Sequence, residues 1–205
     1  MVEAGDLEDG DRPLAPEEVA LVAGAAERRR REFQVGRTCA RRALRGLGLN
    51  EVAILMGPQR EPIWPSGVVG SLTHCGEYCA AAVARSSEVS SLGIDAELVA
   101  ALSPSMIQLV CREGERRQVD ALPGDHWLTL IFSAKEAVYK AWYPMTHLWL
   151  DYQDVELTID PKRGRFQAAI LAGLPHGVIP RNPLPGRFAL SGNIVLTAVA
   201  LLPSS

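Results

Sequence analysis

The sequence predicts an α+β protein, because segments with helical and with strand periodicity follow one another in blocks rather than in strict alternation. Apolar residues recur at helical spacing through residues 16–47, and short segments rich in β-branched residues follow. Further helical segments and a second group of strand-like segments complete the 205 residues. With 47% hydrophobic and 22% charged residues, a chain of this length can build a substantial core.

The first half of the chain predicts a helical region followed by strands. Pro16 stands before two glutamates, which is typical of a helix N-terminus. The pattern that follows predicts one long amphipathic helix or two consecutive helices that break near Gly36. Residues 75–77 are expected to form a hairpin turn. Strands are expected at residues 52–56, 68–73, 78–84 and 91–95.

The second half predicts two helices and then strands. Ser103 suits the cap of a short helix. Asp125 is expected to cap a helix that runs to about Tyr143, where Pro144 stops it. This helix is apolar almost all round, so we expect it in the core, and Trp149 with it. Strands are expected at residues 154–160, 165–171 and 187–202, the last as a hairpin, with a loop at residues 175–186.

Charge and cysteine content argue against several classes of function. The net charge is −3, and the eight arginines of residues 28–45 have no interleaved aromatic platform beyond Phe33, so nucleic acid is not an expected partner. The acidic N-terminal residues do not form an export signal, and the uncharged residues 188–205 alternate like strands, so no membrane span is expected. Four cysteines then indicate reduced thiols in the cytoplasm, and Cys75 and Cys79 lack the second ligand pair of a zinc site.

Two acidic residues in one extended segment suggest a metal site. Asp95 and Glu97 are two positions apart, so in a strand their side chains leave the same face and can converge on one cation. Carboxylate oxygens suit Mg²⁺, or Mn²⁺, better than zinc. The alternative is that Asp95 caps a turn and Glu97 is merely solvated. No G-x-S-x-G, P-loop or G-x-G-x-x-G motif is present, which argues against hydrolase, NTPase and Rossmann chemistry.

Charged residues also interrupt the apolar helix of the second half. Glu136 and Lys140 stand at i and i+4, where the structural alternative is an exposed ion pair worth about 0.2–0.5 kcal/mol. The alternative fits poorly, because Glu136 lies among aromatic positions and Lys135 shares a stripe with apolar ones. A carboxylate held there could be a third metal ligand or a general base.

Together, these motifs resemble the 4'-phosphopantetheinyl transferases of the surfactin/enterobactin type, enzymes that activate carrier proteins. The resemblance covers about residues 27–160. It is carried by residues 93–97 and 132–140 and supported by residues 69–75, 29–33, 36–37, 40–41 and 61–65.

The resemblance implies two similar α+β lobes, a pseudo-dimer, at residues 1–98 and 99–205, with coenzyme A in the cleft between them. It implies a Mg²⁺-dependent monomer that transfers 4'-phosphopantetheine from coenzyme A to a serine of an apo acyl or peptidyl carrier protein, releasing adenosine 3',5'-bisphosphate. Carriers of fatty acid, polyketide or nonribosomal peptide assembly are all open as acceptors. The alternatives are a non-catalytic module that binds coenzyme A or a carrier protein, and a metal-dependent pyrophosphohydrolase.

The resemblance also implies site residues. The metal-ligand positions are matched by Asp95, Glu97 and Glu136. The coenzyme A phosphate positions are matched by Arg29, Arg37 and His74, and the lysines facing the pyrophosphate by Lys135 and Lys140. Glu136 is also implied as the base for the carrier serine, and Asp95 and Lys140 join it as catalytic residues. One position departs from the family pattern: Gln59 stands where a lysine is common, so Arg60 is carried only as a substitute phosphate contact.

Overall fold

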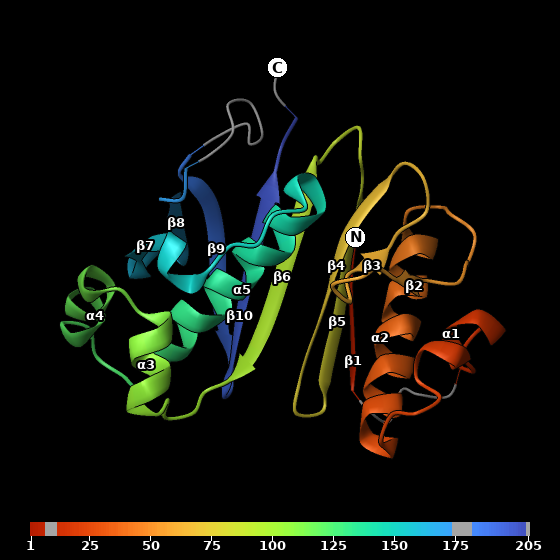
Figure 1. Cartoon of the computed structure of the whole chain (residues 1–205), viewed down its shortest axis with the longest axis horizontal. Coiled ribbons are helices and arrows are strands. Elements are labelled where there is room, and N and C mark those ends of the chain that lie inside the picture. The colour runs from red at the N-terminus through yellow and green to blue at the C-terminus, as the bar shows by residue number, and fades with distance from the viewer. Residues whose placement is uncertain (7–11, 174–181, 204–205) are drawn as a thin grey trace. The chain divides into compact units, whose positions relative to one another are not determined.

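The computed structural model describes residues 1–6, 12–173 and 182–203, which form two compact units, Met1–Leu92 and Gly93–Ser205. We expected the boundary after residue 98, whereas the contacts divide the chain after Leu92. The reason is strand β6 (Ser91–Leu98), which joins the sheet of the second unit next to β10 (Ile194–Leu201) (Figure 1). Asp95, Glu97 and Glu136 therefore belong to the same unit, and not to two different lobes.

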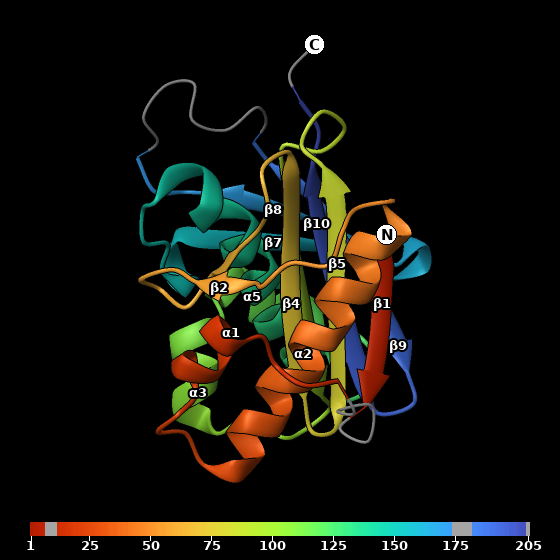
Figure 2. The same ribbon diagram turned by 90° about the vertical axis from the view of Figure 1, so that its right-hand side faces the viewer.

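The first unit sets a long helix against an antiparallel sheet. Helix α2 (Glu27–Gly46) crosses one face of a sheet with the order β1-β5-β4 (Figure 2). The β4–β5 hairpin turns at Gly76, whose φ of 57° favours glycine, as expected from the sequence. The other elements are β1 (Val2–Asp6), α1 (Pro16–Leu21), β2 (Leu55–Met56), β3 (Pro62–Ile63), β4 (Val68–Cys75) and β5 (Tyr78–Arg85).

Three features of the first unit differ from expectation. The helical region breaks between α1 and α2, at residues 22–26, and not at Gly36, which lies inside α2 with open space around it. Strand β1 was not expected, because five acids in the first eleven residues hide its pattern. The strand predicted at residues 52–56 shrinks to Leu55–Met56, paired with the unexpected β3.

A fully buried carboxylate joins the helices of the first unit to the residue that precedes β2. Glu18 is 0% exposed, and its Oε2 accepts hydrogen bonds from the backbone N–H of Ala15 (2.9 Å) and from Nη1 of Arg41 on α2 (2.7 Å). Its Oε1 accepts one from the backbone N–H of Ile54 (2.8 Å). We call these contacts the Glu18 network. Because every partner is a donor aimed at a carboxylate oxygen, the buried charge is well satisfied.

The second unit repeats this plan with a larger sheet. Helix α5 (Trp127–Thr146) packs on β10 of a sheet with the order β6-β10-β9-β8-β7 (Figure 1). Leu130, Ala134 and Val138 of this helix are fully buried. Like α2, it has 20 residues. The other elements are α3 (Pro104–Val110), α4 (Glu113–Asp120), η2 (Tyr152–Asp154), β7 (Val155–Asp160), η3 (Pro161–Arg163), β8 (Arg165–Ile170) and β9 (Leu184–Ser191). The expected α+β class with two similar lobes is confirmed.

Helix ends in the second unit are partly as expected. Ser103 caps α3 by accepting a hydrogen bond from the N–H of Met106. Asp125 does not cap α5, because the N-cap residue is His126. Pro144 lies inside α5, which continues for one more turn until His147 adopts a left-handed conformation with φ 54°. The prediction was wrong because a proline near the C-terminus removes one hydrogen bond without preventing the last turn.

Other differences concern α4 and the loops. Helix α4 was not expected, because its eight residues are mostly charged and show little apolar periodicity. Strand β9 begins at Leu184, inside the predicted loop of residues 175–186; residues 174–181 lie outside the described part of the chain. Strands β9 and β10 form the hairpin expected within residues 187–202, and it turns at Gly192. No helix among the described residues is both long and apolar enough to cross a membrane.

Candidate active site

The site in the second unit depends on a close approach of β6 to α5. A Cβ on Gly93 would lie 2.0 Å from the carbonyl oxygen of Ala137 and 2.7 Å from the backbone nitrogen of Ala141. Only glycine fits a strand that touches a helix backbone in this way. The approach brings the acidic residues that follow Gly93 next to the charged residues of α5.

Asp95, Glu97 and Lys140 form the polar centre of this approach. Asp95 is buried, with 4% of its surface exposed, and its Oδ1 accepts a hydrogen bond from Nζ of Lys140 at 2.7 Å. The pKa of Glu97 is raised to about 7, first by burial and then by the negative charge of Asp95, while Lys140 opposes the shift and Glu136 adds to it. The three carboxylates thus lie close enough to act on one another electrostatically.

This crowding of negative charge is chemically suited to a divalent cation. Three carboxylates without a thiolate or imidazole are hard oxygen donors of the kind that Mg²⁺ prefers. In the described part of the chain, however, no three Asp, Glu, His or Cys side chains are arranged so that they could already hold an ion. Asp95 is instead paired with Lys140, and Glu136 with a tyrosine.

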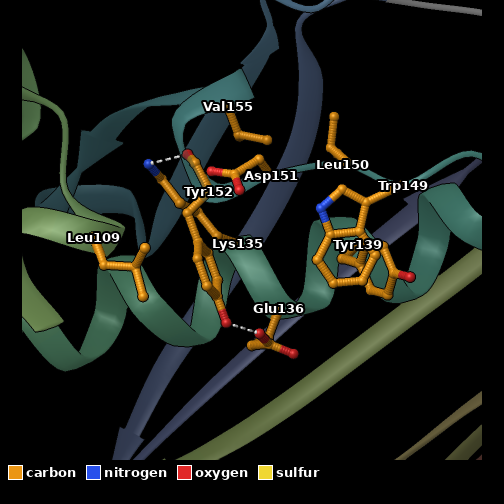
Figure 3. Close-up of a pocket in the computed structure, with 9 residues that line it drawn as sticks. All are labelled: Leu109, Lys135, Glu136, Tyr139, Trp149, Leu150, Asp151, Tyr152 and Val155. Carbon is orange, nitrogen blue, oxygen red and sulfur yellow. Dashed lines mark hydrogen bonds between the residues drawn. The ribbon is translucent and has the colours of Figure 1, made fainter.

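Glu136 lies at the edge of a pocket of about 320 Å³ in the second unit (Figure 3). The hydroxyl of Tyr152 donates a hydrogen bond to Oε1 of Glu136. The pKa of Tyr152 is raised, first by burial and then by this hydrogen bond, which keeps the phenol in its neutral, donating form. Nothing in the sequence pattern indicated Tyr152, which lies 16 residues after Glu136.

Aromatic residues form one wall of this pocket. The rings of Tyr139 and Trp149 meet edge to face with centroids 5.3 Å apart, and both line the pocket together with Leu150. We expected Trp149 in the core, but it is 72% exposed. That prediction was wrong because Trp149 follows the end of α5, where the described residues of the second unit leave most of its side chain uncovered. Trp142, by contrast, is 2% exposed.

Lys135 occupies a different environment from Lys140. It is 2% exposed, and its Nζ donates hydrogen bonds to Oε2 of Glu115 (2.8 Å) and to the carbonyl oxygens of Val110 (2.8 Å) and Tyr152 (2.9 Å). Three acceptors satisfy an ammonium group completely. A direct contact between Lys135 and a pyrophosphate would require these bonds to break, whereas Lys140 is 28% exposed beside the carboxylates.

Two of the expected phosphate-binding residues meet in the first unit. Nη1 of Arg29 lies 3.1 Å from Nε2 of His74, which is exposed at the end of β4. Oε2 of Glu32 lies 3.3 Å from both of these nitrogen atoms. The cluster therefore holds an arginine and a histidine together on the surface, where they could meet an anion.

Arg37 does not belong to this surface cluster. It is 4% exposed, its Nε donates to the carbonyl oxygen of Ile54 at 2.7 Å, and its guanidinium carbon lies 4.0 Å from the ring centre of Phe33. Burial lowers the pKa of Arg37 to about 10, against the opposing effect of Glu18. The structure therefore places Arg37 in the core. Arg60 is exposed in the loop between β2 and β3, with φ 67°.

Comparison with known proteins agrees with this division of the chain. The 4'-phosphopantetheinyl transferase N-terminal domain matches residues 17–84, and the 4'-phosphopantetheinyl transferase superfamily matches residues 91–176. The chain is 45% identical to 4'-phosphopantetheinyl transferase Svp of Streptomyces mobaraensis over 92% of its own length and 78% of that protein. It is 41% identical to 4'-phosphopantetheinyl transferase PptT of Mycobacterium tuberculosis, over 94% and 87%.

Two further likenesses cover less of the chain. Enterobactin synthase component D of Salmonella typhimurium is 39% identical over 57% of this chain and 50% of that protein. Among solved structures, that of Thermotoga maritima holo-[acyl-carrier-protein] synthase (AcpS) covers 54% of this chain and 62% of its own, with a TM-score of 0.43 and 18% identity.

The chain has two α+β units, one with an arginine–histidine cluster and one with carboxylates and a lysine beside a pocket, and the proteins that it matches are transferases. The similarity over nearly the whole chain makes the class specific: the chain belongs to the 4'-phosphopantetheinyl transferase family.

Proposed function

We propose that this chain transfers the 4'-phosphopantetheine group of coenzyme A to a serine hydroxyl of an acyl or peptidyl carrier protein and releases adenosine 3',5'-bisphosphate. The observation that carries the proposal is the group of mutually interacting carboxylates on β6 and α5, next to Lys140 and at the edge of a pocket. Membership of the transferase family supports the same reaction.

The residues that would hold a divalent cation are Asp95, Glu97 and Glu136. The raised pKa of Glu97 supports this assignment, because a bound cation would offset the repulsion among the three carboxylates. Such an ion, Mg²⁺ or Mn²⁺, would neutralise charge on the transferred phosphoryl group and on the leaving phosphate.

The side chains of the second unit supply the remaining chemistry. Glu136 accepts the proton of the carrier serine while the serine oxygen bonds to the phosphorus that carries the pantetheine, and the bond from that phosphorus to the bridging oxygen breaks. Lys140, partly exposed beside Asp95, stabilises the negative charge that moves to the leaving phosphate. The pocket walled by Tyr139, Trp149 and Leu150 suits a slender chain with apolar segments, such as the pantetheine arm.

Arg29 and His74 are proposed to bind phosphate groups of coenzyme A. The exposed arginine–histidine pair in the first unit supports this proposal. Arg37 is better explained as a core residue, so we do not propose it as a phosphate contact. Arg29→Ala should therefore weaken coenzyme A binding, whereas Arg37→Lys should mainly lower stability.

The direct test is incubation with coenzyme A, Mg²⁺ and an apo carrier protein, followed by intact-mass measurement of the carrier. The expected result is the mass of one phosphopantetheine on the carrier and release of adenosine 3',5'-bisphosphate. Omitting the metal, or replacing Asp95 by alanine, should abolish the adduct. Binding of coenzyme A without an adduct under any divalent metal would indicate a binding module, and free phosphopantetheine without an adduct would indicate hydrolysis; either result rejects the proposal.

A further inference from the structure

Tyr152 is anchored at both ends by two consecutive residues of α5. Its backbone carbonyl oxygen accepts a hydrogen bond from Nζ of Lys135 at 2.9 Å, and its hydroxyl donates one to Oε1 of Glu136 (Figure 3). Consecutive side chains on a helix diverge by about 100°. A single residue can contact both Lys135 and Glu136 only by lying across the helix. The ring of Tyr152 lies in this way along the wall of the pocket.

The anchor at Lys135 is itself fixed by a buried ion pair. Glu115 on α4 is 0% exposed, and its Oε2 accepts from Lys135 (2.8 Å) and from the backbone N–H of Arg112 (2.7 Å). Its Oε1 accepts from the backbone N–H of Leu157 on β7 (2.8 Å). We call these contacts the Glu115 network. Breaking it would leave a charge buried without its partner, so Lys135 has little freedom to move.

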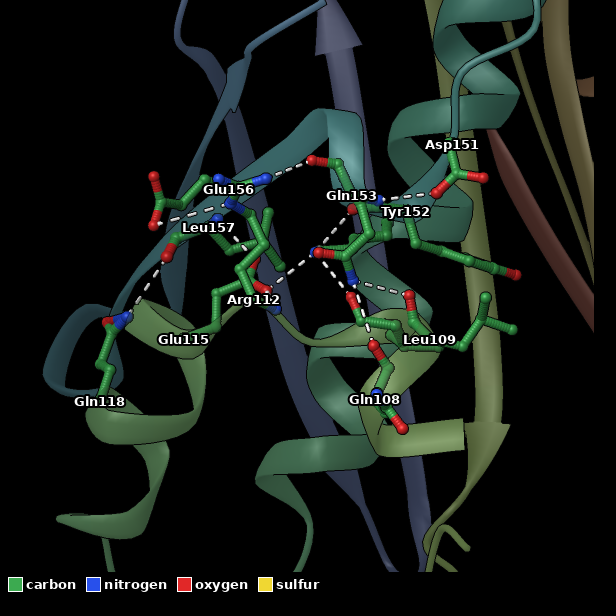
Figure 4. Close-up of polar contacts among 12 residues, drawn as sticks. Gln108, Leu109, Arg112, Glu115, Gln118, Asp151, Tyr152, Gln153, Glu156 and Leu157 are labelled. Carbon is green, nitrogen blue, oxygen red and sulfur yellow. Dashed lines mark hydrogen bonds and ion pairs between the residues drawn. The ribbon is translucent and has the colours of Figure 1, made fainter. Parts of the chain in front are cut away.

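The residue after Tyr152 is held by further polar contacts (Figure 4). Nε2 of Gln153 donates to the carbonyl oxygen of Leu109 at 2.7 Å and to that of Gln108 at 3.4 Å. Arg112 donates to the carbonyl oxygen of Gln153. These bonds tie η2 to the C-terminal end of α3 and the start of α4, so the backbone that carries Tyr152 is fixed on both sides.

The position of Glu136 on α5 does not by itself fix the orientation of its carboxylate. A glutamate has three rotatable side-chain bonds, and orienting its carboxylate costs conformational entropy unless another group holds it. Figure 3 shows that the oxygen of Glu136 that does not meet Tyr152 is turned away from the tyrosine. The rigid tyrosine thus holds one oxygen of the carboxylate and sets the direction of the other.

We propose that Tyr152 is a positioning residue for Glu136, whose carboxylate it orients for proton transfer from the carrier serine. The inference rests on the proposed function, because only there does Glu136 act as a base. Lys135 and Glu115 act one step further away: they hold the backbone of Tyr152, and Tyr152 holds Glu136.

The test compares Tyr152→Phe with Tyr143→Phe. The first variant removes only the hydroxyl and keeps the ring that packs against Phe132, with ring centres 5.8 Å apart. The second removes the same atom from a tyrosine of α5 that does not line the pocket. We would measure kcat and KM for coenzyme A, the affinity for coenzyme A in EDTA by calorimetry, and the thermal unfolding temperature.

For Tyr152→Phe we expect kcat to fall about tenfold to a hundredfold, as for the loss of one hydrogen bond to a charged group. KM, the metal-free affinity and the unfolding temperature should stay close to wild type, and Tyr143→Phe should resemble wild type throughout. An unchanged kcat in Tyr152→Phe overturns the inference. So does a parallel loss of kcat, affinity and unfolding temperature, because that result shows a purely structural role.

A measurement independent of activity separates this inference from the proposed function. The carboxyl ¹³C resonance of Glu136, assigned by its loss in Glu136→Gln, should move in Tyr152→Phe and stay in place in Tyr143→Phe at one fixed pH. A resonance that does not move shows that the contact is absent, and the inference fails while the proposed function stands. If the wild-type protein never modifies a carrier but the resonance moves, the contact exists, and the positioning role fails together with the proposed function.

Discussion

Replacing Lys135 by methionine should destabilise the second unit rather than remove a contact with coenzyme A. Lys135 matches a lysine implied to face the pyrophosphate, yet its ammonium group is buried and donates to three acceptors. Methionine keeps the length and apolar part of the side chain but cannot donate a hydrogen bond or carry a charge. The variant therefore isolates the loss of the ammonium group.

The size of the effect follows from the groups that are left behind. Glu115 is 0% exposed, and in the variant its charge would keep only the N–H groups of Arg112 and Leu157 as partners within the Glu115 network. Removing one partner of a buried ion pair costs about 3–5 kcal/mol. We take about 4 kcal/mol, a large share of the roughly 5–15 kcal/mol by which a domain is stable. With a urea m-value of about 2 kcal/mol per M, the unfolding midpoint falls by about 2 M.

Urea unfolding followed by tryptophan fluorescence measures this shift, since Trp127 and Trp142 are buried in the second unit. Lys162→Met, on the exposed η3 turn, is the control and should change stability by less than about 0.5 kcal/mol. Lys135→Met combined with Glu115→Gln should recover at least half of the loss, because no buried charge is left unpaired. A Lys135→Met midpoint equal to that of wild type, together with weakened coenzyme A binding, would refute the reasoning and restore the phosphate role.

Three further predictions concern positions whose surroundings are equally specific. The pKa of Glu97 is about 7 in the folded protein against 4.5 for a free glutamate, so between these pH values the metal-free folded state binds more protons than the unfolded state. The unfolding temperature of the metal-free protein should therefore fall as pH rises from about 5 to 7.5. The variant Glu97→Gln should lack this contribution to the pH dependence. Gly93→Ala should lower the free energy of unfolding, measured in urea, by about 1–3 kcal/mol or more, because the new Cβ would collide with the carbonyl oxygen of Ala137. Gly36→Ala, where a Cβ meets open space within a helix, should instead raise the free energy of unfolding by about 0.5–1 kcal/mol. Glu18→Gln should lower the stability of the first unit by about 3 kcal/mol, and an unchanged midpoint would contradict the role given to the Glu18 network.

The sequence was most informative where a local pattern determines the structure. The β4–β5 and β9–β10 hairpin turns each carry a glycine that adopts positive φ, Gly76 and Gly192, and turn chemistry of this kind depends only on neighbouring residues. The apolar pattern of α5 correctly predicted a buried helix, and the same pattern made Glu136 and Lys140 conspicuous. The charges on β6 and α5 could therefore be recognised as a site before their contacts were known.

Side-chain partners that lie far apart in the sequence could not be predicted. The stripe that contains Lys135 correctly predicted that the lysine is surrounded by apolar residues, but its partner Glu115 comes from α4, whose charged sequence did not indicate a helix. Tyr152 reaches Glu136 from η2, whose backbone is held against α5 by the hydrogen bond from Lys135. Arg37 shows the same limit, since the carbonyl group that binds it belongs to Ile54, 17 residues away.

The Glu18 and Glu115 networks indicate that the two units share one structural solution. In each unit, the third residue of a short helix is a fully buried glutamate. Its Oε2 accepts one hydrogen bond from the backbone N–H of the helix's N-cap residue and another from a cationic side chain of the long helix. In each, Oε1 accepts a backbone N–H from the chain that forms or precedes the next strand. The cation differs, arginine in the first unit and lysine in the second.

An atom-by-atom match of this kind is not required by an α+β fold, since a buried ion pair can often be replaced by apolar residues without loss of stability. Its presence in both units therefore shows that they share a common local frame. The residues beside this frame differ: the second unit uses the residue that follows its lysine, Glu136, for the proposed proton transfer, whereas Arg42, which follows Arg41 in the first unit, is positively charged. The frame positions a residue on the long helix in both units, and only in the second is that residue an acid.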